Sequence, residues 1–115
     1  MQKYTFVVFS EATAGEEVEY HRWYNEQHLP DVIKVPGFLA AQRFKLFNAS
    51  GNPSNAATFL ALYEVETDDL EKCLAEMRRR AGTPQMILSD AIDLSRTTGT
   101  MYAEITPRIT RAGND

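Results

Sequence analysis

The fold is decided by residues 4–30, which read YTFVVFSEATAGEEVEYHRWYNEQHLP. Residues 4–9 form a short β-branched and aromatic run that polar residues follow, which predicts a buried strand. Thr13 then precedes Glu16 by three residues. This is the spacing of a capping box, in which the two residues cap each other's backbone N–H groups, and it predicts a helix that continues to about His28.

The remainder of the chain repeats this strand–helix arrangement. Pro30 and the turn at residues 35–37 are expected to end the first helical region. Asp68 and Glu71 repeat the capping-box spacing before a second helix. The other predicted elements are, in order, a strand at 38–47, a hairpin loop at 48–55, a strand at 57–65, the second helix ending near Arg80, a short helix beginning at Pro84 and a strand at 98–106.

The resulting βαββαβ order is that of the ferredoxin-like α+β fold, with one four-stranded antiparallel sheet and both helices on one face. Residues 1–107 are predicted to form a single domain, and residues 108–115 a polar C-terminal tail. Thr5, Val7 and Phe9 alternate with the residues that face the helices and would lie on the uncovered face. Because this face is apolar, we expect a two-fold dimer whose sheets pack face to face.

Composition narrows the class of protein further. The chain has 115 residues and a formal net charge of −4, which suits one globular domain. A single cysteine excludes an internal disulfide framework and a zinc site built from several thiolates. No signal peptide is expected, no apolar run approaches the roughly 18 residues of a membrane span, and no long basic run suggests nucleic acid. A cytoplasmic protein with neither a membrane nor a nucleic-acid partner is expected.

The first helix carries the unusual chemistry. At 100° per residue, one arc of the helix is predicted to face inward and holds Val18, His21, Tyr24, Asn25, His28 and Leu29. The two histidines are roughly 10 Å apart along the axis, too far to share one metal ion, so no metal site is expected. Each is either a core histidine bonded to a polar neighbour or part of a ligand pocket. His28 lies at the helix end and is the better acid–base candidate.

Other residues have both a structural and a functional interpretation. Trp23 projects toward the charged side of the helix, where it would make a dimer or inter-helix contact or line a ligand site. Arg43 interrupts an apolar strand, so it either pairs with a carboxylate or stabilises a developing oxyanion. Cys73 repeats with apolar neighbours at helical spacing and is predicted to pack in the core. Asp90 and Asp93 are expected to be caps or solvated, unless one of them orients a histidine.

The stretch EEVEYHRWYNEQHLPD at residues 16–31, followed by VPGF at 35–38 and by Arg43 and Phe44, resembles an EthD-like member of the dimeric α+β barrel superfamily. The resemblance is close over residues 3–47 and extends to the remainder by layout. It implies a homodimer that forms a dimeric α+β barrel, with a pocket between the sheet and the helices of each protomer. Relatives include cofactor-free monooxygenases, cyclases, dehydratases, isomerases and haem-using proteins.

The resemblance also implies roles for single residues. His28 matches the family's helix-end histidine and would act as an acid–base, while Tyr24 and Trp23 match its aromatic pair. His21 is not part of the family pattern.

Two hypotheses of different class follow. The first is a small cofactor-independent enzyme of the lyase or dehydratase type that acts on an aromatic or polyketide-like molecule. Its predicted catalytic residues are His28 and His21, and its predicted substrate-binding residues are Tyr24, Asn25, Trp23 and Arg43. No cofactor is expected. The alternatives are a cofactor-free monooxygenase and a non-catalytic dimer that binds a small ligand, with a haem-binding protein as a third.

Overall fold

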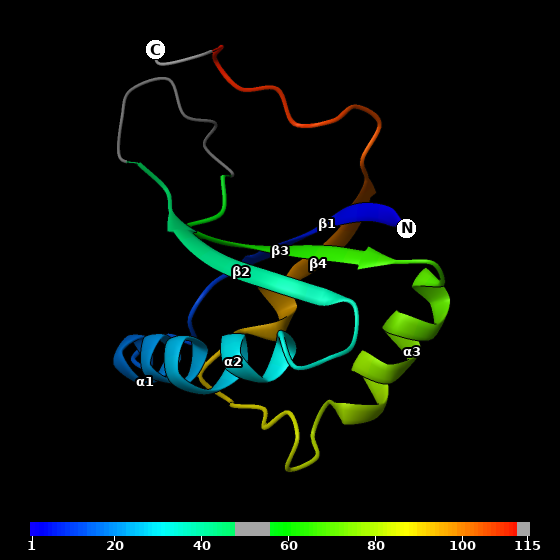
Figure 1. Cartoon of the computed structure of the whole chain (residues 1–115). Coiled ribbons are helices and arrows are strands. Elements are labelled where there is room, and N and C mark those ends of the chain that lie inside the picture. The colour runs from blue at the N-terminus through cyan, green and yellow to red at the C-terminus, as the bar shows by residue number, and fades with distance from the viewer. Residues whose placement is uncertain (48–55, 113–115) are drawn as a thin grey trace.

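Four strands form one antiparallel sheet in the spatial order β2-β3-β1-β4, seen edge-on in Figure 1. The computed structural model describes residues 1–47 and 56–112. β1 is central and pairs with both β3 and β4, while β2 pairs with β3. The strands are β1 (Gln2–Ser10), β2 (Phe38–Lys45), β3 (Phe59–Thr67) and β4 (Thr98–Ala103).

The helices all lie on one side of this sheet (Figure 1). They are α1 (Glu17–Trp23), η1 (Tyr24–His28), α2 (Leu29–Val32), α3 (Leu70–Arg80) and the short 3₁₀ turn η2 (Leu94–Arg96). The predicted ferredoxin-like α+β fold is therefore confirmed. The predicted hairpin loop at 48–55 and the end of the predicted tail lie outside the described residues.

The first helix is longer than predicted. α1, η1 and α2 follow one another without a break, so the helix continues through Pro30 to Val32, four residues past the predicted end near His28 and before the turn at 35–37. A proline inside an α-helix lacks an N–H and its ring collides with the carbonyl four residues earlier. Here the turn before Pro30 is π-helical, and the Leu29 N–H bonds to the Tyr24 carbonyl five residues back. In the wider π turn the hydrogen bonds reach five residues back, which relieves the collision between the Pro30 ring and the carbonyl four residues earlier.

Both predicted capping boxes are wrong in detail. The Thr13 hydroxyl donates to the carbonyl of Asp90 at 2.7 Å, and no side chain caps the helix that begins at Glu17. The second helix is capped by Asp69, whose carboxylate accepts from the Lys72 N–H at 3.1 Å, one residue later than predicted. A cap depends on where the chain turns into the helix, and spacing alone does not fix that residue.

The segment between α3 and β4 also differs from the prediction. No helix begins at Pro84, where the chain instead makes a turn closed by the Met86 N–H and the Thr83 carbonyl at 3.0 Å. Farther along, Asp93 caps η2 by accepting from the Ser95 N–H at 3.0 Å, as one interpretation of the sequence expected. The last strand ends at Ala103 rather than near residue 106.

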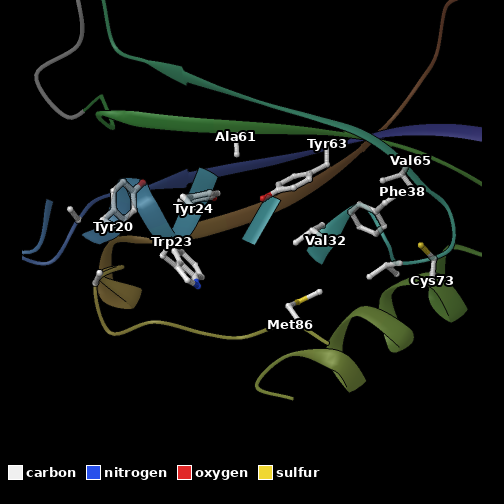
Figure 2. Close-up of a cluster of buried hydrophobic side chains, with 13 residues drawn as sticks. Tyr20, Trp23, Tyr24, Val32, Phe38, Ala61, Tyr63, Val65, Cys73 and Met86 are labelled. Carbon is white, nitrogen blue, oxygen red and sulfur yellow. The ribbon is translucent and has the colours of Figure 1, made fainter. Parts of the chain in front are cut away.

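The core lies between the sheet and the helices and is rich in aromatic rings (Figure 2). Tyr20, Trp23 and Tyr24 reach it from the first helix, and Tyr63 reaches it from β3. Cys73 is 5% exposed and its thiol donates to the Pro36 carbonyl at 3.2 Å, which confirms that it packs in the core. Burial of these large side chains supplies most of the driving force for folding.

The opposite face of the sheet has no helix over it in the part of the chain that the structure describes (Figure 1). Val7 pairs with Leu62, and Phe9 pairs with Leu60, on strands whose other residues face the core. Phe9 remains 43% exposed and Phe44, opposite Leu60 on β2, 42% exposed. We call this apolar surface the open face.

No helix in the described part of the chain is both long and apolar enough to cross a membrane. The cytoplasmic location stays a prediction.

Candidate functional site

A cavity of about 330 Å³ lies between the sheet and the helices. The strands contribute Phe6, Val8, Tyr63 and Gly99, the first helix contributes Trp23, Tyr24, His28 and Val32, and α3 and the segment after it contribute Met77, Arg78, Ala81, Met86, Leu88, Ser89, Ile92, Leu94 and Thr97. This volume falls at the small end of the range typical of ligand pockets, roughly 300–1,000 Å³. The wall is largely apolar, as expected for a site that binds an aromatic or aliphatic group.

Two residues that line this cavity each carry a buried polar atom without a partner in the described part of the chain. Within the described residues, His28 Nδ1 and the Tyr63 hydroxyl are buried without a hydrogen bond. Tyr24 is near enough to Tyr63 to perturb its pKa, but their hydroxyls do not meet hydrogen-bond geometry. Leaving a buried polar group unsatisfied costs about 1–3 kcal/mol. A bound molecule that hydrogen-bonds both atoms would remove this cost.

Aromatic rings hold the imidazole of His28 in place. It stacks on Trp23 with a centroid distance of 4.5 Å and an angle of 21° between the ring planes. It also meets Tyr24 edge-on at 5.3 Å. The Trp23 indole is itself fixed, because its N–H donates to the Ile87 carbonyl at 2.9 Å. His28 is therefore a group whose orientation is set before any ligand arrives.

Burial determines the protonation of both orphan groups. Burial lowers the pKa of His28 to about 4, and the negative charge of Asp31 opposes this only in part. Burial, reinforced by Tyr24, raises the pKa of the Tyr63 phenol well above its ordinary value. At neutral pH the imidazole is therefore uncharged and able to accept a proton, while the phenol keeps its proton and can donate a hydrogen bond.

The predicted position of Trp23 on the charged side of the helix is wrong. Trp23 is 3% exposed and lines the cavity, whereas Val18, predicted to face inward, is 87% exposed. The inward face instead follows Tyr20, Tyr24, His28 and Val32 in steps of four residues. An α-helix alone would let such a row drift around the axis, and the π turn η1 offsets that drift.

His21, Asn25 and Arg43 lie together, but apart from His28. Arg43 donates to Asn25 Oδ1 at 2.7 Å and lies 3.2 Å from His21 Nδ1. None of the three lines the cavity. The single site predicted from the helix pattern is thus two separate clusters, with Tyr24 between them: it lines the cavity, and its ring lies 4.3 Å from the Arg43 guanidinium.

Sequence reasoning missed Tyr63 and Arg78. Tyr63 alternates with buried Ala61 and Val65 in a predicted strand, so a hydroxyl on the core-facing side was the available signal. Arg78 is exposed and lines the cavity from the last turn of α3, and the sequence carries no signal that would separate it from the two arginines that follow.

Among the described residues, no group of three or more histidine, cysteine, aspartate or glutamate side chains is placed to hold a metal ion.

Solved structures with a similar fold include three bacterial proteins. One is described as "a putative monooxygenase", from Shewanella loihica PV-4, with a TM-score of 0.55 and 16% identity over 97% of this chain and 99% of that one. Another is an ethyl tert-butyl ether D (EthD) family protein from Bacillus halodurans C-125, with a TM-score of 0.56 and 12% identity over 91% of this chain and 100% of that one. A third, of unknown function, is from Nitrosomonas europaea, with a TM-score of 0.55 and 15% identity over 97% and 98% of the two chains. No protein-family model and no curated protein matches the sequence. At this level of identity the similarity shows the fold, which is that of EthD-like proteins.

Proposed function

We propose that this chain, which has the fold of EthD-like proteins, is an enzyme that binds a small, mostly apolar molecule and moves a proton on it with His28. The observation that supports this most directly is that two residues lining one apolar cavity carry buried polar atoms without a partner, His28 Nδ1 and the Tyr63 hydroxyl. A preformed pocket with few, convergent polar groups is the usual form of a small-molecule site.

The two groups have complementary roles in proton transfer. Uncharged His28 accepts a proton from an acidic C–H beside a substrate carbonyl, and the Tyr63 O–H donates to the oxygen on which negative charge then develops. Arg43, to which the sequence assigned that second role, does not line the cavity. Because a base whose pKa is about 4 is weak, the substrate must itself acidify the proton, as it does where the C–H lies between two carbonyl groups of a polyketide-like molecule.

In the lyase form of the reaction, the substrate is a β-hydroxy carbonyl compound. Loss of the proton to His28 forms a C=C bond as the C–O bond breaks, and the imidazolium returns the proton to the leaving oxygen. The products are an unsaturated carbonyl compound and water, so neither an oxidant nor a cofactor takes part.

The experiment measures dehydration of aromatic β-hydroxy ketones by the unaltered chain and by His28→Ala. Because acid–base catalysis contributes about 10²–10⁴-fold, we expect turnover to fall by at least 100-fold in this variant. The matched variant is His21→Ala, which removes the other histidine from a position outside the cavity. Equal turnover in His28→Ala and the unaltered chain would contradict the proposal.

A second candidate is cofactor-free monooxygenation, which the description of the Shewanella loihica protein favours. His28 would again remove the proton, and the resulting carbanion would react with O₂. A CH₂ group then becomes C=O, while the second oxygen atom leaves as water. An oxygen electrode distinguishes the two reactions, because the monooxygenase consumes one O₂ per product and stops under nitrogen, whereas the lyase is unaffected. A chain that binds these ketones without converting them under either gas would instead be a ligand-binding protein.

We also propose that two copies associate through their open faces into a dimeric α+β barrel. The support is the uncovered apolar surface around Phe9, Leu60 and Phe44. Sheets with one apolar, uncovered face usually bury it against another layer.

A further inference from the structure

Arg43 is a half-buried cation whose partners are all neutral. Its guanidinium donates to Asn25 Oδ1 at 2.7 Å and approaches His21 Nδ1 at 3.2 Å. No carboxylate among the described residues forms an ion pair with it, although Arg22, Arg79 and Arg96 each have one. Its positive charge is therefore held in place but not compensated.

The guanidinium is also fixed by rings beneath it. Its Cζ lies 4.3 Å from the centroid of the Tyr24 ring, and 5.2 and 5.7 Å from those of Tyr20 and Phe59. These cation–π contacts, together with the two neutral hydrogen-bond acceptors, hold the Arg43 guanidinium in one orientation. A positioned guanidinium loses little freedom when it binds, which favours recognition of planar oxyanions.

Arg43 opens onto a hollow of about 310 Å³ on the far side of Tyr24 from the cavity. The hollow is lined by His21, Asn25, Arg43, Phe44, Lys45 and Phe59. It contains a second cation, Lys45, and no carboxylate of the residues that the structure describes lines it. The ring of Phe59, which meets the His21 ring edge-on at 4.8 Å, supplies an apolar wall beside the charges.

We propose that this hollow is a separate binding site for a small oxyanion, held by Arg43 and Lys45, with His21 and Asn25 positioning the guanidinium. The shared chemistry is a pair of anionic oxygens, as in a carboxylate or a phosphate, and the Phe59 ring favours one attached to an aromatic ring. The site is independent of proton transfer at His28, because none of its cations lines the cavity.

His21 reports on the occupancy of this site. Burial and the charges of Arg43 and Lys45 lower its pKa, and Glu17 opposes them. A bound anion would offset the two positive charges, so the pKa of His21 is expected to rise. By linkage, the anion then binds more tightly as the pH falls through that pKa.

The experiment follows the His21 imidazole by NMR while benzoate, inorganic phosphate or uncharged benzamide is added at constant ionic strength. We expect saturable shifts with benzoate or phosphate, and none with benzamide. Stronger binding of benzoate would identify an aromatic carboxylate as the ligand class, and stronger binding of phosphate a phosphate group.

Three variants separate this site from general charge effects. Arg43→Gln is expected to weaken benzoate binding at least about tenfold, the loss of one charge-assisted contact. Lys45→Gln should weaken benzoate binding less. Lys45 is exposed and forms no ion pair among the described residues, so this variant is expected to fold and tests the site even if Arg43→Gln does not fold. Arg22→Gln removes the same charge from a residue already paired with Glu19, and is expected to leave binding unchanged. Equal weakening by Arg22→Gln and Arg43→Gln, or shifts with benzamide, would overturn the proposal.

Discussion

His28 links the cavity to the stability of the fold. Its pKa is about 4 in the folded chain and near 6.5 when exposed in the unfolded chain, so the unfolded state binds the proton more readily between these values. The stability that comes from keeping His28 neutral is therefore present above about pH 6.5 and is lost as the pH falls toward 4. The shift corresponds to roughly 3 kcal/mol.

Urea unfolding at pH 7 and pH 4 tests this link. The free energy of unfolding of the unaltered chain is expected to fall by up to about 3 kcal/mol more than that of His28→Asn, which cannot titrate there. The carboxylates titrate in both proteins and cancel in the difference. Identical pH dependence in the two proteins would show that His28 is not held neutral by burial.

The Tyr63 hydroxyl is expected to favour ligand binding but to lower the stability of the ligand-free protein. Its hydroxyl has no partner among the described residues, so Tyr63→Phe removes an unsatisfied group and leaves the ring in place. We expect the ligand-free protein to gain about 1 kcal/mol and ketone turnover to fall. Tyr4→Phe is the control, because Tyr4 does not line the cavity. Thermal unfolding and turnover measurements test these two expectations. A Tyr63→Phe protein less stable than the unaltered chain would mean that the hydroxyl already has a hydrogen-bond partner.

At the scale of elements, the π turn η1 is what aligns His28 with the cavity. Pro30→Ala restores a backbone N–H and removes the ring that opposes α-helical register. We expect the turn to relax toward α-helix, with unchanged or higher stability but weaker ketone turnover, because His28 rotates away from Tyr63. Pro84→Ala, in an exposed turn, is the control. Full turnover in Pro30→Ala would show that the π turn does not position the histidine.

The same element explains why the sequence predicts the fold better than the site. Strands and helices follow from runs such as residues 4–9, whose apolar pattern survives a boundary error of one or two residues. A helical wheel, however, assumes one constant angle per residue. The π turn changes that angle between Tyr24 and His28. A wheel that includes His28 at a constant angle is therefore rotated away from the face that Tyr20 and Trp23 form in α1, and it placed Asn25 inside and Trp23 outside. The sequence therefore identified His28 as a candidate base, but it did not predict which side chains lie beside it.

At the scale of the whole molecule, the open face determines how copies associate. If two sheets pack face to face, a charge placed on that face must be buried in the interface at high cost. Phe9→Lys is therefore expected to shift the chain from dimer to monomer in sedimentation experiments. Val18→Lys is the control, because Val18 is 87% exposed on the helix side. A monomeric unaltered chain, or a dimer that tolerates Phe9→Lys, would contradict the proposed interface.

The stacking of Trp23 on His28 also makes tryptophan fluorescence a reporter of the cavity. Trp23 is the single tryptophan of the chain, so all indole emission comes from the cavity wall. A charged imidazolium quenches an indole with which it is in ring contact, so the emission should dim as acid reaches His28. A molecule that enters the cavity will change the surroundings of the same fluorophore. Unlabelled protein can thus be screened against compound collections by its intrinsic tryptophan fluorescence.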